Sequence, residues 1–118
     1  DGDTPGRAYH FRQSWIRQKL KASPSQLRIM HVEGDSMVPT LHDGDAVLVD
    51  MTRQFPSPPG IFVFDDGMGL VAKRLAHIPN SDSPAVRVIS DNTLYPAYER
   101  TADEIRIIGR IRWFAREI

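Results

Sequence analysis

The sequence predicts a mostly β fold of twisted antiparallel β-sheets, with one short helix near the N-terminus. Two observations lead to this class. Apolar runs of strand length recur between clusters of Gly, Pro, Asn, Asp and Ser, whereas only one stretch has the spacing of an amphipathic helix. In addition, the 118 residues are 41% hydrophobic and 25% charged, which is typical of a single globular domain.

The N-terminal part is predicted to contain a leader and a helix. Residues 1–10 begin with two Gly and one Pro within six positions, which indicates a flexible leader or the end of a linker. Residues 11–118 are expected to form the domain. A short helix is predicted over about Arg12 to Lys21, and Ala22 to Ser25 ends it. The apolar residues with helical spacing are Phe11, Trp15, Ile16 and Leu20.

Strands are predicted for six later runs, which are Leu27–Val32, Ala46–Met51, Ile61–Phe64, Gly69–His77, Ala85–Ser90 and Ile105–Phe114. Asp66-Gly67 supplies the positive φ that a tight turn needs between the third and fourth runs. Arg53–Gly60 contains three prolines and is expected to be a loop, as are Tyr95-Pro96 and Tyr98. Gly109 is expected to mark a bulge or bend in the last strand.

Ser36 lies in the stretch from Glu33 to Asp50, EGDSMVPTLHDGDAVLVD, whose residue types suit chemistry as well as packing. Gly34 allows a tight turn just before this serine, and Pro39 limits any helix just after it. Ser36 is therefore expected on a short turn between two strands. Such a serine can be a nucleophile, or it can merely stabilise its turn, and spacing alone favours the second interpretation.

Lys73 has a different setting from the other lysines. The chain has 12 Arg but only 3 Lys, and Lys19 and Lys21 lie in a polar N-terminal segment. Lys73 lies within a predicted strand, among Leu70, Val71, Ala72 and Leu75. Apolar surroundings lower the pKa of a lysine, and its neutral amine can then act as a general base toward a hydroxyl. In the commoner alternative, only the aliphatic stem is buried and the ammonium reaches water.

The composition argues against several classes of function. A formal net charge of zero argues against nucleic-acid binding by this domain itself, because neutralising phosphates needs a surplus of Lys and Arg. Without Cys there is no disulfide, thiolate chemistry or Cys-based zinc site, and a cytoplasmic location fits. The four His form no i, i+4 pair, so we expect no metal and no cofactor. No apolar run approaches about 18 residues and no signal segment opens the chain, so we expect no membrane association.

One short motif, Ser90-Asp91-Asn92, is similar to part of the penicillin-binding signature. The S-x-x-K and K-T-G parts of that signature are absent from the chain. This interpretation is therefore rejected.

Five motifs together resemble one known family. In chain order they are GDSMVPTL, HDGDAVLVD, VAKRL, SDNTLYP and IIGRIRWF, with Ser36 and Lys73 37 positions apart. They resemble the C-terminal domain of LexA and of phage CI-type repressors, which the polymerase accessory protein of SOS mutagenesis shares. The resemblance covers residues 27–116. It implies a LexA/signal-peptidase-like fold, with Ser36 as nucleophile and Lys73 as general base of a self-cleaving Ser-Lys dyad.

The resemblance also implies a function. The chain would be the regulatory domain of a phage- or prophage-type transcriptional repressor, a serine-type endopeptidase that cuts its own linker. RecA filaments would stimulate the cut, and the cut would separate the dimer from an upstream DNA-binding domain. Only that upstream domain would bind DNA. Backbone N–H groups of Gly34 and Ser36 are expected to form the oxyanion hole. The family cuts an Ala-Gly or Cys-Gly bond; neither occurs here, and Asp1-Gly2 lies at about that position.

Two other functions stay open. The dyad can be vestigial, which would leave an oligomerisation module whose repression is relieved by an antirepressor protein. The chain can also belong to the polymerase accessory subunit, which needs only a short upstream arm. A helix-turn-helix pattern upstream of Asp1 would indicate a repressor, and its absence the accessory subunit.

The last predicted strand supplies a candidate dimer interface. Apolar groups among arginines are typical of protein interfaces, and five such residues are expected on one side of this strand. They are Arg106, Ile108, Arg110, Arg112 and Phe114. We expect a two-fold symmetric homodimer, or a higher oligomer, through this strand. The alternative is an edge strand that its arginines protect from aggregation.

Overall fold

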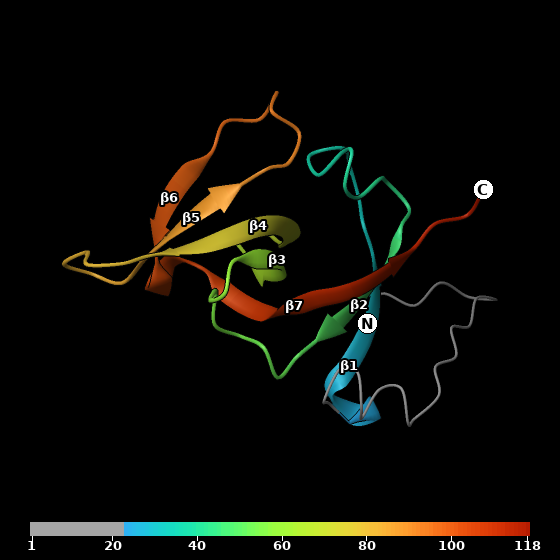
Figure 1. The fold of residues 1–118 in the computed structure, drawn as a ribbon, viewed down its shortest axis with the longest axis horizontal. Helices are drawn as coiled ribbons and strands as arrows, with labels where there is room; N and C mark the ends of the chain where they lie inside the picture. The colour runs from blue at the N-terminus through green and yellow to red at the C-terminus, as the bar shows by residue number, and fades with distance from the viewer. Residues whose placement is uncertain (1–22) are drawn as a thin grey trace.

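The computed structural model describes residues 23–118, so the predicted leader and the predicted helix over Arg12 to Lys21 lie outside the described residues. The described chain forms one seven-stranded antiparallel sheet in the order β1-β2-β7-β3-β4-β5-β6 (Figure 1). Its strands are β1 (Leu27–His31), β2 (Ala46–Asp50), β3 (Gly60–Asp65), β4 (Leu70–Ile78), β5 (Ala85–Ile89), β6 (Tyr98–Thr101) and β7 (Arg106–Ala115). Two 3₁₀ turns precede β1 and β7, η2 (Pro24–Gln26) and η3 (Ala102–Glu104). The predicted mostly β class is confirmed.

All six predicted strands are present, and each of their ends lies within one residue of the prediction. The prediction missed β6, which pairs with β5 at one edge of the sheet. The β6 sequence, YERT, has no apolar run, because an edge strand needs to bury only part of one face. The expectation that Tyr98 lies in a loop is therefore wrong, and its ring packs against a core cluster. Among residues 23–118, no helix is long and apolar enough to cross a membrane.

β7 lies in the middle of the sheet, between β2 and β3, although it comes last in the sequence (Figure 1). The alternative that this strand is an edge strand is therefore wrong. The register shifts twice along β7, at Arg112 in the pairing with β2 and at Ile108 in the pairing with β3. Ile108 lies next to Gly109, so the predicted irregularity at this glycine is confirmed. A Cβ atom on Gly109 would lie 2.5 Å from the Asp50 carbonyl oxygen, so the backbones of β2 and β7 leave no room for a side chain.

Both faces of the sheet are covered, as β3 shows. Phe62, Val63 and Phe64 are all buried, although successive strand residues point to opposite faces. Phe62 and Phe64 belong to one cluster, with Leu75, Val86 and Val88. Val63 belongs to a second cluster, with Val32, Met37, Leu41, Val47 and Val49. This second cluster contains residues on both sides of Ser36 in the sequence, so core packing fixes the turn that carries the serine.

Candidate active site

Ser36 begins a compact turn in the connection between β1 and β2, as predicted. Gly34 has a φ of 82°, a left-handed conformation that glycine adopts without strain. The Val38 N–H donates to the Asp35 carbonyl at 3.2 Å, and the Leu41 N–H donates to the Met37 carbonyl at 2.9 Å. Met37 and Leu41 are each only 1% exposed. The turn is thus anchored by buried side chains on one side, while Ser36 itself stays half-buried.

The second turn of this connection, Asp43-Gly44-Asp45, is hydrogen-bonded to the residues just before Ser36. The Gly34 N–H donates to Asp43 Oδ1 at 2.7 Å, and the Gly44 N–H donates to the Val32 carbonyl at 2.7 Å. Asp45 is buried, and the Arg116 guanidinium donates to its two oxygens at 2.8 and 2.7 Å. These hydrogen bonds hold the pKa of Asp45 below its ordinary value. The Gly34 amide, one of the two expected oxyanion donors, is therefore engaged by Asp43.

Lys73 lies on β4, where it pairs with the buried Phe62 of β3. Its Nζ donates a hydrogen bond to the Ser90 hydroxyl at 3.2 Å and lies 5.5 Å from the centre of the Tyr95 ring. Desolvation lowers the pKa of Lys73, and the negative charge of Asp66 opposes this change. Within the described part of the chain, no carboxylate forms an ion pair with this amine. The surroundings therefore favour the neutral amine more than water does, in agreement with the direction predicted from the sequence.

Ser36 and Lys73 line the same cleft, which has a volume of about 490 Å³. Its walls come from β1, from the Ser36 turn and from the first half of β4, with one residue each from β2 and β3. Most of the other lining side chains are apolar, and they are Met30, Val32, Met37, Val47, Val63, Leu70, Val71 and Ala72. His31 and Glu33 complete the lining. A hydroxyl and an amine with a lowered pKa in one cleft can serve as a nucleophile and its general base.

The segment from Ser90 to Tyr95 contacts the Ser36 turn, and sequence reasoning did not find this role. The Asn92 N–H donates to the Ser36 carbonyl at 3.0 Å, and the Asn92 side-chain amide donates to the Asp35 carbonyl at 3.1 Å. The Tyr95 hydroxyl donates to Asp35 Oδ1 at 2.5 Å. The sequence signal was the motif SDNTLYP, which contributed to the family resemblance, but sequence reasoning gave none of its residues a role in the site.

Asp91 fixes this segment to β4 and to the far end of the Ser36 turn. Arg74 donates to both carboxylate oxygens, at 2.8 and 2.7 Å, and the Thr40 hydroxyl donates to Oδ2 at 2.5 Å. The Asp91 N–H also donates to Met37 Sδ at 3.4 Å. The hydrogen bonds from Arg74 are the main reason why the pKa of Asp91 lies below its ordinary value. The segment is therefore held by charge-assisted hydrogen bonds, which are stronger than neutral ones.

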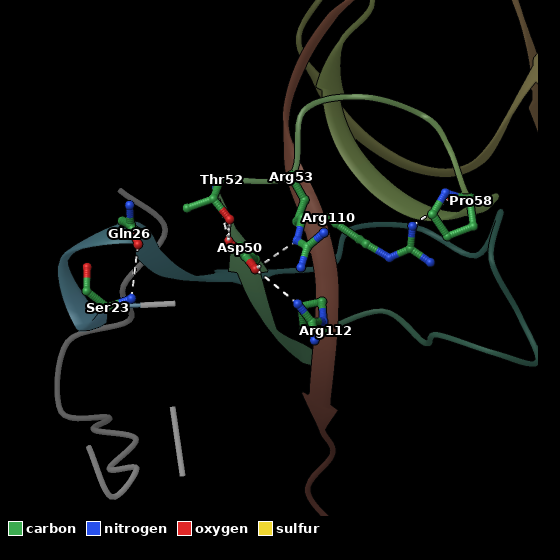
Figure 2. A network of polar contacts seen from close by, with 8 residues as sticks. All are labelled: Ser23, Gln26, Asp50, Thr52, Arg53, Pro58, Arg110 and Arg112. Atoms are coloured by element: carbon green, nitrogen blue, oxygen red, sulfur yellow. Dashed lines mark hydrogen bonds and ion pairs between the residues drawn. The ribbon is translucent and has the colours of Figure 1, made fainter. Parts of the chain in front are cut away.

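The residues expected at a dimer interface do not all lie on one side of β7, because the two register shifts interrupt its alternation. Ile108 packs against the core cluster around Val63. Arg110 donates to the Pro58 carbonyl, and Arg112 donates to the buried Asp50 at 3.1 Å (Figure 2). Arg110 also donates to the Pro59 carbonyl. Arg106 and Phe114 are exposed. Two of the arginines that were expected on an outer surface of β7 therefore bind groups within the domain: Arg112 binds Asp50, and Arg110 binds the loop before β3.

A turn serine and a desolvated lysine that line one cleft are the two side chains that a serine peptidase of the Ser-Lys type would use. A family model described as Peptidase S24-like matches residues 2–112, and the chain belongs to this family. The chain is also 28% identical over 109 residues to the 26 kDa repressor protein of Escherichia phage HK022. That alignment covers 89% of this chain and 45% of the relative, so the chain spans about half the length of the repressor it matches.

Proposed function

We propose that this chain is the regulatory peptidase domain of a transcriptional repressor, and that it cleaves a peptide bond with a dyad of Ser36 and Lys73. The observation that carries the proposal is the single cleft lined by both residues, in which desolvation lowers the pKa of the lysine. Membership of the peptidase family supports the chemistry. The similarity to a phage repressor supports the regulatory role.

The proposed reaction follows from the two side chains. The neutral Lys73 amine takes the proton of the Ser36 hydroxyl while Oγ attacks the scissile carbonyl carbon. We propose the Ser36 N–H as the backbone donor for the oxyanion, since no acceptor for this N–H lies within residues 23–118. The Gly34 N–H is less suitable, because it would first have to break its hydrogen bond to Asp43 Oδ1. The Lys73 ammonium then protonates the leaving amine. A water molecule, deprotonated by Lys73, hydrolyses the resulting acyl-enzyme.

The proposed substrate is the linker that precedes this domain in a repressor, so that cleavage separates dimerisation from DNA binding. RecA filaments are the proposed stimulus, through the family resemblance. DNA would be contacted only by a domain upstream of residue 1.

A second candidate is a vestigial domain that only oligomerises and responds to an antirepressor protein. Two observations favour it. The Lys73 amine donates its hydrogen bond to Ser90 rather than to Ser36, and the chain contains neither an Ala-Gly nor a Cys-Gly dipeptide.

Self-cleavage of a fusion protein separates the two candidates. A reporter protein is joined before residue 1, and Asp1→Ala creates an Ala-Gly bond. The fusion should be cut faster as the pH rises from neutral through the lowered pKa of Lys73, even without RecA. Ser36→Ala and Lys73→Met should each abolish the cut, and Ser36→Ala should leave the Tm nearly unchanged. Release of the reporter is followed on gels between neutral and alkaline pH.

The matched control is Ser81→Ala, which removes a hydroxyl whose hydrogen bond, to the Ile78 carbonyl at 3.3 Å, lies in the turn between β4 and β5. It should cut at the wild-type rate. A Lys73→Met fusion that still cuts at the wild-type rate would end the dyad hypothesis. Absence of cleavage at every pH, with binding of an antirepressor intact in both dyad variants, would favour the oligomerisation module.

A further inference from the structure

Ser90 combines two properties that the proposed reaction does not yet explain. It follows directly after β5, and it is only 8% exposed. Its hydroxyl accepts the hydrogen bond from Lys73 Nζ at 3.2 Å. A buried serine of this kind normally satisfies the backbone of its own turn. Here the hydroxyl instead reaches an amine on the neighbouring strand, 17 positions away in the sequence.

The chemical nature of this acceptor matters because Lys73 must be neutral to accept a proton. A carboxylate in the same place would attract the ammonium and raise the pKa of the amine. A hydroxyl carries no charge, so it can restrict the torsions of the long lysine side chain with little stabilisation of the ammonium. The other charged or titratable groups around Lys73 are Asp66 in the β3–β4 turn, Tyr95 above the amine, and His31 and Glu33 in the cleft wall. Arg74, beside it on β4, is paired with Asp91.

The neighbours of Ser90 link it to the nucleophile as well. Asn92, two residues later, donates its backbone N–H to the Ser36 carbonyl at 3.0 Å. Between them, Asp91 is clamped by Arg74 and Thr40. One rigid three-residue segment therefore contacts the base at one end and the nucleophile's backbone at the other, and misplacement of reacting groups by about 1 Å can cost about 100-fold in rate.

We propose that Ser90 is the positioning residue of Lys73: an uncharged acceptor that holds the amine in the cleft it shares with Ser36 without adding a counter-charge. This role rests on the proposed function, because only a proton-transfer reaction needs a neutral amine. The contact between Ser90 and Lys73 does not depend on that function, and it can be measured separately.

The first measurement follows Lys73 directly in the 118-residue chain. The chain contains only three lysines, so labelling with ¹³Cε-lysine gives one NMR signal for each, and a pH titration gives their midpoints. The Lys73 signal should titrate at a lower pH than those of Lys19 and Lys21. Ser90→Asp should raise the Lys73 midpoint, whereas Ser90→Ala should leave it low. A Lys73 midpoint that does not respond to Ser90→Asp in the folded protein would overturn the proposal.

The second measurement is the pH profile of cleavage of the Ala-Gly fusion. Ser90→Ala should lower the alkaline plateau by about 10- to 100-fold with little change in the midpoint, because the amine is neutral but poorly placed. Ser90→Thr, which restores a hydroxyl, should recover most of the rate. Ser90→Asp should shift the profile to higher pH. Ser81→Ala, the matched hydroxyl deletion outside the cleft, should follow the wild-type profile.

The outcomes separate the proposal from the proposed function. A full cleavage rate in Ser90→Ala, or equal losses in Ser90→Ala and Ser90→Thr, would show that the hydroxyl does not position the base. If the wild-type fusion is not cut at any pH, the proposed function fails, and the NMR titration still decides whether Ser90 controls Lys73. If Ser90→Asp does not fold, the comparison of the Ala and Thr variants decides in its place.

Discussion

Burial on β4 lowers the pKa of Lys73, so the folded domain holds fewer protons at this amine than the unfolded chain does between the lowered pKa and the ordinary one. The free energy of unfolding therefore rises with pH across this window. Below the window, the folded state carries the full cost of the partly desolvated ammonium. The same desolvation that causes this cost favours the neutral amine, which the proposed base would need.

Lys73→Met keeps the volume of the side chain and removes that cost. We expect it to raise the Tm by a few degrees at neutral pH. The gain should shrink as the pH approaches the ordinary pKa of lysine, because the wild-type amine then becomes neutral in both states. Thermal unfolding of both proteins at neutral and alkaline pH measures this difference.

The control for this experiment is Arg87→Met on β5, since the Arg87 side chain is 51% exposed and stays charged over the whole range. Its effect on the Tm should not depend on pH. If the effect of Lys73→Met on the Tm were equally independent of pH, the ammonium of Lys73 would be solvated, as in the alternative in which only the aliphatic stem is buried.

At the scale of single elements, β7 depends on the absence of a side chain at Gly109. A Cβ atom there would lie 2.5 Å from the Asp50 carbonyl oxygen and 2.8 Å from Val49 Cγ1, so β2 and β7 would have to separate. Gly109→Ala should destabilise the domain by about 1–3 kcal/mol, the usual range for overpacking a core. Urea unfolding with a shared m-value gives the difference in free energy.

Gly60→Ala is the matched comparison on β3. Its new Cβ would meet the Arg110 guanidinium, the far end of a flexible side chain that can move aside. The loss of stability should therefore be clearly smaller than for Gly109→Ala. Equal losses would mean that contact between the β2 and β7 backbones is not what excludes a side chain at Gly109.

Sequence reasoning was accurate for these elements where the deciding signal is local. The strands follow from apolar runs, the Ser36 turn follows from Gly34 and Pro39, and the direction of the Lys73 pKa follows from its apolar neighbours. The segment Ser90–Tyr95 could not be assigned in this way, because its contacts with the Ser36 turn join residues 51 to 60 positions apart. The positions of Ile108 and Arg112 were missed because a bulge depends on the partner strand and not on the strand's own alternation.

At the scale of the whole molecule, we predict a two-fold symmetric homodimer that uses the exposed part of β7. Phe114 is 45% exposed, and the Arg116 guanidinium lies over its ring at 5.3 Å, a combination typical of interfaces. The domain should sediment as a dimer at micromolar concentration. Phe114→Glu should shift it to monomer by placing a charge in the contact.

Met68→Glu is the control for the dimer, because Met68 is 94% exposed in the turn between β3 and β4. This variant should remain dimeric. A monomer for the wild type and for both variants would rule out the proposed interface.

The central place of β7 also has a consequence for synthesis of the protein. Without residues 106–115, the β1–β2 hairpin that carries the Ser36 turn has no strand joining it to the β3–β6 group that carries Lys73. A nascent chain that has not yet produced these residues therefore lacks the strand that joins the part of the sheet next to Ser36 to the part that contains Lys73. Under the proposed function, self-cleavage would have to wait until translation has passed β7, so a nascent chain would not be cut before the domain is complete.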